Sequence, residues 1–412
     1  MDYSLRRLLA FLILLFGAGC AGTNLAPAQP LAATTVAPTR ISQPTATVTL
    51  TATATASRPT LTPIPTDTPV SSESALGFGY GPVNFPEGIN PLTGLKVSDL
   101  SILERRPLVI KITNFPRQVR PQWGLNSADH IYEYYLEDDL TRFIGIFYGR
   151  DASQVGPIRS ARPFDMHIVR AYKGVFVFGF ADSRIYNLLM ESEFSNRLVL
   201  QRPDNCPPLC RIGESRDYNN LFTDTALMSQ YITERGTSNG PQDVDGLRFE
   251  EKTYVVSGGG GANRVAIRFS VESYNRWEYD PISQQYLRFQ ESQSLAEGQE
   301  AYLPLFDSLS GKQVAADNLI ILFVKTDYYF RSHSTEIFDI QLEGEGEAYA
   351  LRQGKIFRIN WQRQGRDAVL VLKFANGTPY PLRPGNIWFE VMGATTYYER
   401  AGDEWKFTFS FP

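Results

Sequence analysis

A change of composition near residue 86 is the sequence feature that most limits what this chain can fold into. Between Ala33 and Pro69 the chain contains 13 Thr and 6 Pro, and residues 21–86 carry only four charged side chains. A segment of this kind buries too little apolar surface to offset the loss of chain entropy. We therefore expect residues 21–86 to form a disordered Thr/Pro-rich stalk, so that residues 87–412 build the fold.

The first 20 residues have the features of a lipoprotein signal peptide. Arg6 and Arg7 precede a nine-residue apolar run, 8–16, which is too short to cross a membrane as a mature helix. Small residues and then Cys20 follow, in an order that resembles a bacterial lipobox. An ordinary secretory signal with an incidental cysteine is the alternative. We expect residues 1–20 to be the signal peptide and lipobox, and a lipid on Cys20 to anchor the chain to the extracytoplasmic face of the bacterial cell membrane.

The charge and the rare residues exclude several classes of function. The net charge of −4 disfavours a nucleic-acid binder. With three His and three Cys among 412 residues, we expect no metal site built from these residues. The chain contains no G-x-S-x-G or S-x-x-K nucleophile motif, and no cofactor is expected.

Short apolar runs alternate with helical segments between residues 87 and 240. The predicted strands are Leu108–Thr113, His130–Leu136, Arg142–Tyr148 and Val175–Phe180. The short link 137–140 predicts that the second and third of these form a hairpin. The predicted helices are Ser160–Lys173, Ser183–Glu191 and Thr223–Arg235. This interleaving predicts an α/β-type domain over residues 87–240.

Residues 241–412 are predicted to form a mostly antiparallel β domain, either a sandwich or a partial barrel. Turn signals such as Gly258–Gly261 separate its short candidate strands. These strands are Thr253–Ser257, Arg264–Phe269, Arg276–Tyr279, Gln285–Phe289, Leu319–Val324, Glu336–Leu342, Lys355–Gln362, Ala368–Phe374, Ile387–Val391 and Lys406–Phe411. The folded chain is therefore assigned to the α+β class.

Two series of short motifs occur in a fixed order along the chain. The first includes Asn90-Pro91-Leu92-Thr93-Gly94, Arg120-Pro121-Gln122, Thr141-Arg142-Phe143 and the run from Gly156 to Pro163. The second includes Trp277-x-Tyr279-Asp280, Gly344-x-Gly346-x-Ala348 and Pro384-Gly385-x-x-Trp388. Together these motifs closely resemble the YerB-like lipoproteins, a bacterial family described as a domain of unknown function. The resemblance covers about residues 88–395 and implies a two-domain lipoprotein, without implying a particular activity.

Two loops depart from the pattern of the family that the chain resembles. That family usually has Gly-Gly where this chain has Asp138-Asp139, and a glycine-rich loop where this chain has residues 179–183. If either loop contacts a ligand, we expect the ligand specificity of this chain to differ from that of the family.

Arginines form the strongest candidate site. Arg120, Arg142, Arg159 and Arg162 all lie at predicted strand ends, in loops or at a helix start, and Ser160 lies between the last two. A guanidinium binds phosphate or carboxylate through two parallel hydrogen bonds, and the unpaired amides of a helix N-terminus favour anions. These residues therefore form a candidate anion site. The alternative is a structural network of ion pairs with nearby carboxylates.

Two carboxylates accompany the arginines. Glu133 and Glu137 are four residues apart, which would place them on one face of a strand. They are either a general acid/base pair or counter-ions for the arginines, and we favour the counter-ions because no nucleophile accompanies them.

Cys206 and Cys210 are too close in sequence, with too little histidine nearby, to suggest zinc. Outside the cytoplasm they would form either a small disulfide or a pair of free thiols.

Two functional hypotheses follow from these features. In the first, the chain is a lipid-anchored envelope protein that binds an anionic ligand, such as a phosphate-bearing glycopolymer or a partner protein. In the second, it is an envelope enzyme that acts on phosphate-linked cell-wall glycan precursors, with arginines gripping the phosphates beside the paired carboxylates. Convergence of the four arginines with Glu133 in one concave pocket would favour the enzyme.

Overall fold

The computed structural model describes residues 79–213, 218–250 and 259–410. Cys20, stalk residues 21–78 and the predicted strand Thr253–Ser257 lie outside these ranges. The described part is mostly β, with mixed and antiparallel sheets. None of its helices is long and apolar enough to span a membrane.

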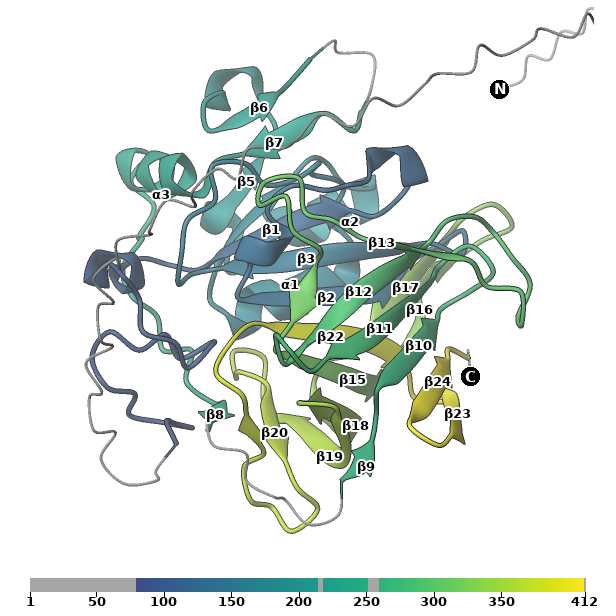
Figure 1. Cartoon of the computed structure of the whole chain (residues 1–412). Coiled ribbons are helices and arrows are strands. Elements are labelled where there is room, and N and C mark those ends of the chain that lie inside the picture. The colour runs from purple at the N-terminus through teal and green to yellow at the C-terminus, as the bar shows by residue number, and fades with distance from the viewer. Residues whose placement is uncertain (1–78, 214–217, 251–258, 411–412) are drawn as a thin grey trace, which may run out of the picture. The chain divides into compact units, whose positions relative to one another are not determined.

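A mixed sheet of eleven strands forms the centre of the fold (Figure 1). Its strands, in spatial order, are β20 (Val371–Lys373), β19 (Lys355–Arg363), β18 (Gly344–Arg352), β15 (Asn318–Val324), β22 (Ile387–Gly393), β2 (His130–Tyr135), β3 (Thr141–Phe147), β1 (Leu108–Thr113), β4 (Val175–Phe178) and β5 (Leu198–Leu200), with β9 (Gly260–Gly261) paired to β19. Every residue of β1, β2, β4 and β22 is buried. Coverage of both faces explains why these strands are near-continuous apolar runs in the sequence.

The hairpin of β2 and β3 connects two segments that are distant in sequence. The two strands pair in antiparallel fashion, with Tyr134 opposite Arg142. On its other side β2 pairs in parallel with β22, with His130 opposite Ile387. One sheet therefore contains strands from both regions that the sequence analysis divides at residue 240, and β2 and β22 lie side by side in Figure 1.

Seven strands form a second sheet. They are β13 (Tyr302–Pro304), β12 (Gln285–Glu291), β11 (Tyr274–Asp280), β10 (Arg264–Arg268), β24 (Glu404–Thr408) and β23 (Tyr397–Ala401), with β14 (Ala315–Ala316) paired to β12. Trp277 of this sheet packs against Trp388 of β22, with ring centroids 5.1 Å apart. This contact is part of the apolar core between the two sheets.

Three short two-stranded sheets and three α-helices complete the described elements. The small sheets pair β16 (Thr326–Arg331) with β17 (Glu336–Ile340), β21 (Pro381–Leu382) with β8 (Arg248–Phe249), and β6 (Leu209–Arg211) with β7 (Leu221–Thr223). The helices are α1 (Pro163–Ala171), α2 (Ser183–Met190) and α3 (Thr225–Glu234). Single 3-10 turns occur at Leu100–Glu104, Arg117–Val119, Leu125–Ser127, Ser195–Arg197 and Pro203–Asn205.

The large sheet has a separate apolar core on each face. Side chains of α1 and α2, such as Phe164, Ile168 and Ile185, belong to one core. Side chains of α3 and the second sheet, such as Met228 and Trp277, belong to the other. Polar side chains that alternate along β2 and β3 therefore face different surroundings, depending on which face they occupy.

Two local findings differ from the sequence expectations. Gly260 and Gly261, expected in a hairpin turn, instead pair with Lys355 and Ile356 as an edge strand. At the N-terminal side, Tyr80 lies within the range assigned to the stalk, yet its backbone exchanges two 2.8 Å hydrogen bonds with Phe249. The part of the chain that is joined to the fold therefore includes Tyr80.

Candidate functional site

Three of the four candidate arginines gather beside the start of α1. Arg142 is the second residue of β3, Arg162 is the N-cap of α1, and Arg159 precedes that helix by four residues. Burial, and then the charges of Arg162 and Arg159, lower the pKa of Arg142 to about 10. Among the described residues, the side chain of Arg142 makes no hydrogen bond or salt bridge, so its charge has no direct partner there.

Arg162 is paired, in contrast to Arg142. Its Nε donates to Glu137 at 2.9 Å, and its terminal nitrogen forms a salt bridge with the same carboxylate. Burial opposes ionisation of Glu137, but the hydrogen bond and charge of Arg162 hold the pKa of that carboxyl below its ordinary value. Glu137 is therefore a counter-ion of Arg162.

The N-terminus of α1 offers few free amides to an anion, contrary to the sequence expectation. The amide of Arg162 donates to Asp165 Oδ2 at 2.8 Å, and Pro163 has no amide hydrogen. The amide of Asp165 donates to the carbonyl of Arg162 at 3.1 Å. The helix is capped by its own aspartate, so an anion here would depend on side chains.

A buried polar triad lies beneath the arginines. Asp165 Oδ1 accepts from Lys111 Nζ at 3.0 Å and from the Tyr134 hydroxyl at 2.5 Å, and Lys111 also contacts that hydroxyl. Burial, opposed by the charge of Asp165, lowers the pKa of Lys111 to about 7. The triad anchors α1 to β1 and β2 and thus fixes the helix start that carries Arg162.

Two adjacent hollows open beside this cluster, and both are lined by Ser160 and Phe180. The basic hollow, of about 340 Å³, is lined by Ile158, Arg159, Ser160, Gly179, Phe180, Gln201, Arg211, Tyr218 and Leu221. The mixed hollow, of about 390 Å³, is lined by Glu137, Asp138, Ser160, Arg162, Phe180, Ala181, Asp182, Ile185, Ser334, Thr335, Glu336 and Ile337. Residues of both loops that depart from the resembled family line the mixed hollow.

The basic hollow takes its positive charge from two arginines. Arg159 and Arg211 line it, and none of the described lining residues is a carboxylate. Arg211 donates to two neutral oxygens, Asn220 Oδ1 at 2.8 Å and Gln201 Oε1 at 2.9 Å. These bonds orient the guanidinium without neutralising its charge.

Arg120 and Glu133 lie on the opposite face of the hairpin, away from the other candidates. Arg120 pairs with the buried Glu291 at 2.6 Å. Glu133 accepts from Arg288 at 2.5 Å and from the Thr141 hydroxyl at 2.6 Å. The structure therefore does not bring Glu133 and Glu137 together: β2 ends at Tyr135, so strand alternation does not extend to Glu137.

A second carboxylate accompanies Glu133 between the two sheets. Glu390 accepts from Trp277 Nε1 at 2.8 Å and from Arg288 at 3.1 Å, and it is fully buried. Burial, and then the charge of Glu133, raise the pKa of Glu390 to about 8, against the opposing charge of Arg288. One arginine, Arg288, thus faces two carboxylates in a site closed to solvent. These three residues therefore stabilise the contact between the two sheets and are not accessible to a ligand.

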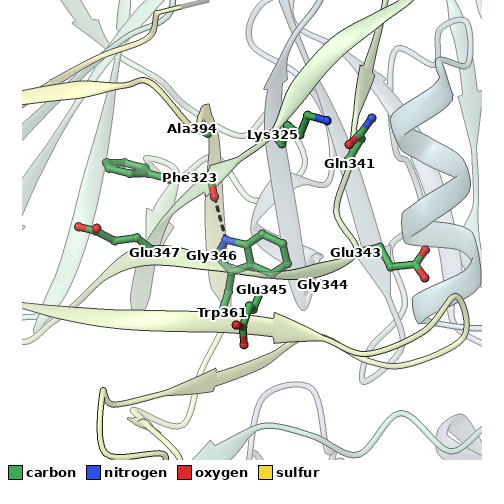
Figure 2. Close-up of a pocket in the computed structure, with 10 residues that line it drawn as sticks. All are labelled: Phe323, Lys325, Gln341, Glu343, Gly344, Glu345, Gly346, Glu347, Trp361 and Ala394. Atoms are coloured by element: carbon green, nitrogen blue, oxygen red, sulfur yellow. Dashed lines mark hydrogen bonds between the residues drawn. The ribbon is translucent and has the colours of Figure 1, made fainter. Parts of the chain in front are cut away.

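A third hollow, of about 430 Å³, lies where β15 and β18 diverge (Figure 2). Trp361 reaches across Gly346 and donates to the carbonyl of Phe323 at 2.9 Å, as the dashed line in Figure 2 shows. Of its carboxylates, Glu347 pairs with Arg358 and Glu345 accepts from Gln362. The motif Gly344-x-Gly346 therefore serves strand packing in this structure.

The two remaining questions from the sequence concern the cysteine pair and a metal site. Cys206 and Cys210 are joined by a disulfide, in the segment that leads into Arg211. Within the described ranges, no group of three or more His, Cys, Asp or Glu residues could hold a metal ion.

Sequence reasoning did not single out Arg211 and Tyr218 of the basic hollow, and it noted Phe180 only as part of the loop 179–183. Arg211 follows the cysteine pair and has no motif of its own, so nothing local marks it. Phe180 was placed at the end of a buried strand, but β4 ends at Phe178 and the Phe180 side chain is 64% exposed. Its position directly after an apolar run is visible in the sequence, but its exposure is visible only in the structure.

The fold and the site define a mostly β protein whose central mixed sheet carries a basic hollow next to the start of its first helix. Its family follows from two matches: residues 92–238 match the "Protein of unknown function (DUF3048) N-terminal domain", and residues 265–389 match the C-terminal domain of the same family. The chain belongs to the DUF3048 family.

Comparison with individual proteins agrees with this assignment. The chain is 25% identical over 318 residues to the "Putative lipoprotein YerB" of Bacillus subtilis (strain 168), across 73% of this chain and 85% of that protein. The crystal structure of the YerB protein from Bacillus subtilis has the same fold, with a TM-score of 0.61 and 22% identity, over 74% of this chain and 96% of that one. The resemblance to the YerB-like lipoproteins is thereby confirmed.

Proposed function

We propose that this protein binds an anionic group, a phosphate or a carboxylate, in the basic hollow. The observation that carries the proposal is that Arg159 and Arg211 line this hollow while none of its described lining residues is a carboxylate. Arg142, which has no salt bridge within the described chain, adds a third positive charge nearby. An anion there would reduce the repulsion between these positive charges.

The lipid anchor also belongs to this proposal. The lipobox-like sequence before Cys20 and the name of the Bacillus relative both support a lipid-anchored protein. We place the folded part at the extracytoplasmic face of the membrane, where a phosphate-bearing glycopolymer or an envelope protein would be within reach.

Binding is preferred to catalysis because of where Glu133 lies. The enzyme hypothesis requires a carboxylate beside the arginine cluster, but Glu133 is bonded to Arg288 on the other face of the sheet. Glu137 is bonded to Arg162 and thus serves as a counter-ion. No nucleophile pattern accompanies either residue.

A thermal-shift titration of the full-length chain with inorganic phosphate tests the proposal. A ligand that binds only the native state stabilises it by RT ln(1 + [L]/Kd), about 2.7 kcal/mol at a hundredfold excess over Kd. We expect Arg211→Met to remove most of this stabilisation. We expect Arg142→Met to weaken it and to raise the stability of the free protein, because the variant loses a charge that is repelled by Arg162 and Arg159 and has no ion pair within the described ranges.

Arg358→Met is the matched control. Arg358 is an exposed arginine on β19 that pairs with Glu347, outside both hollows. This variant should keep the full phosphate response. No stabilisation of the wild type by phosphate, or an equal response in all three variants, would rule out the anion site.

A further inference from the structure

We infer that the site takes a sugar that carries a single phosphate, with the phosphate in the basic hollow and the sugar ring passing over Phe180 into the mixed hollow. This inference rests on the proposed anion site and adds the identity of the group attached to the anion. It follows from three features of the two hollows: their shared wall, the exposed ring between them, and the difference in their charge.

Because the two hollows share a wall, a single ligand can occupy both of them. Ser160 and Phe180 line each hollow, so a molecule bound in one extends toward the other across these two residues. The backbone there is held firmly, because the amide of Ala161 donates to the carbonyl of Phe180 at 2.8 Å. The crossing point is therefore a fixed edge of the site.

Phe180 presents an apolar ring at that edge. Its side chain is 64% exposed, and Tyr186 of α2 stacks on it with ring centroids 6.4 Å apart. An exposed phenyl ring between two polar hollows has little structural purpose of its own, since its burial stabilises the fold only in part. The apolar face of a pyranose ring could cover this phenyl ring and exclude water from it.

The mixed hollow suits an uncharged, hydroxyl-rich group. Three of its carboxylates already have arginine partners: Glu137 with Arg162, Asp182 with Arg184 at 3.2 Å, and Glu336 with Arg331 at 3.0 Å. Among the described residues, the hydroxyls of Ser160, Ser334 and Thr335 form no hydrogen bonds with the protein. These hydroxyls are available to the hydroxyls of a sugar.

Asp138 gives the site a preference for one phosphate over two. It lines the mixed hollow, is exposed, and has no ion pair within the described chain. Its charge would repel a second anionic group placed there, whereas a neutral sugar would be tolerated. The same charge disfavours an acidic peptide that extends across both hollows.

Binding of four probes to the full-length protein tests the inference: inorganic phosphate, glucose 1-phosphate, glucose 1,6-bisphosphate and a tetra-glutamate peptide. Wild type should bind glucose 1-phosphate about five- to tenfold more tightly than phosphate, because part of the Phe180 ring is removed from water. Phe180→Ala should remove this advantage. Ile282→Ala, which truncates a 93% exposed apolar side chain elsewhere, should retain it.

Asp138→Asn tests the charge preference in the same assay. Wild type should bind the bisphosphate no more tightly than glucose 1-phosphate, and the variant should gain a few-fold in affinity for the bisphosphate only. If wild type binds phosphate but glucose 1-phosphate gains nothing, or if Phe180→Ala keeps the gain, the inference fails while the anion site stands. Tighter binding of the peptide would also overturn it, in favour of a protein partner. If no probe binds, the anion site itself is wrong.

Discussion

The surroundings of a charged side chain in this protein depend on which face of the β2–β3 hairpin it occupies. On the face toward α1, Arg142 has no ion pair among the described residues, and the neighbouring Arg159 and Arg162 line the open hollows. On the face toward the second sheet, Arg288, Glu133 and Glu390 are all fully buried. The charges on the first face lie beside open hollows, whereas those on the second face are paired with one another and closed to solvent.

Glu390 should make the stability of the protein depend on pH. Its pKa is raised to about 8, so the native state keeps a proton that the unfolded chain releases between pH 4.5 and about 8. The free energy of unfolding should therefore fall as the pH rises through this window. Glu390→Gln cannot lose a proton, and we expect it to reduce that fall by at least about 1 kcal/mol, as measured by urea unfolding at pH 5 and pH 8.

Glu404→Gln is the control for that measurement, since Glu404 is an exposed partner of Arg264 on β24. Its unfolding free energy should decline with pH as the wild type does. Identical slopes for wild type and Glu390→Gln would show that Glu390 ionises normally in the native state.

At the scale of elements, the divergence of β15 and β18 depends on a glycine. The register between these strands ends with Leu322 opposite Ala348, and beyond it the indole of Trp361 bridges the gap. A Cβ on Gly346 would lie 2.5 Å from Trp361 Nε1 and 2.8 Å from the carbonyl oxygen of Phe323. The strand can therefore pass beneath the indole only without a side chain.

Gly346→Ala should displace Trp361 and break its hydrogen bond to Phe323. We expect a loss of about 2–3 kcal/mol in the free energy of unfolding, together with a change in tryptophan fluorescence. Gly240→Ala, at a glycine with open space around it, should change stability by no more than about 0.5 kcal/mol. Equal stability of the two variants would mean that the indole does not need the glycine.

At the scale of the whole molecule, the two family domains share their central sheet. The N-terminal family region contains β2, and β22 begins at the end of the C-terminal one, yet the two strands pair along five residues from His130 to Tyr134. The apolar core around Trp277 and Trp388 also contains residues of both regions, such as Phe143. Neither region can bury its strands without the other.

We therefore expect the described part of the chain to unfold in one cooperative transition. Far-ultraviolet circular dichroism and tryptophan fluorescence should give coincident denaturation curves. A fragment of residues 79–240 expressed alone should not adopt a stable fold, because β2 would present an unpaired apolar edge. Two resolved transitions, or a well-dispersed NMR spectrum of the fragment, would contradict this expectation.

Local patterns in the sequence determined much of the secondary structure. The strands β1, β2 and β3 and the three α-helices lie where apolar runs and helical segments predict them, because hydrogen bonding and side-chain periodicity act between near neighbours. The strand β18 was missed, since its first residues are glycine and glutamate. The stalk and the lipid on Cys20 remain predictions from composition and motif.

Tertiary structure alone decided which charged residues meet. Arg120 resembled the other arginines in sequence, yet its partner Glu291 is 171 residues away. Arg211 of β6 and Phe180, directly after β4, line the same hollow, whereas Glu133 lies on the opposite face, where it pairs with Arg288. Ion pairs between residues that are distant in sequence depend on burial and on the order of the strands. Neither property can be read from a short stretch of the chain. The sequence therefore determined the elements and the abundance of arginine, and the packing of the sheet determined which arginines are paired and which of them line a hollow.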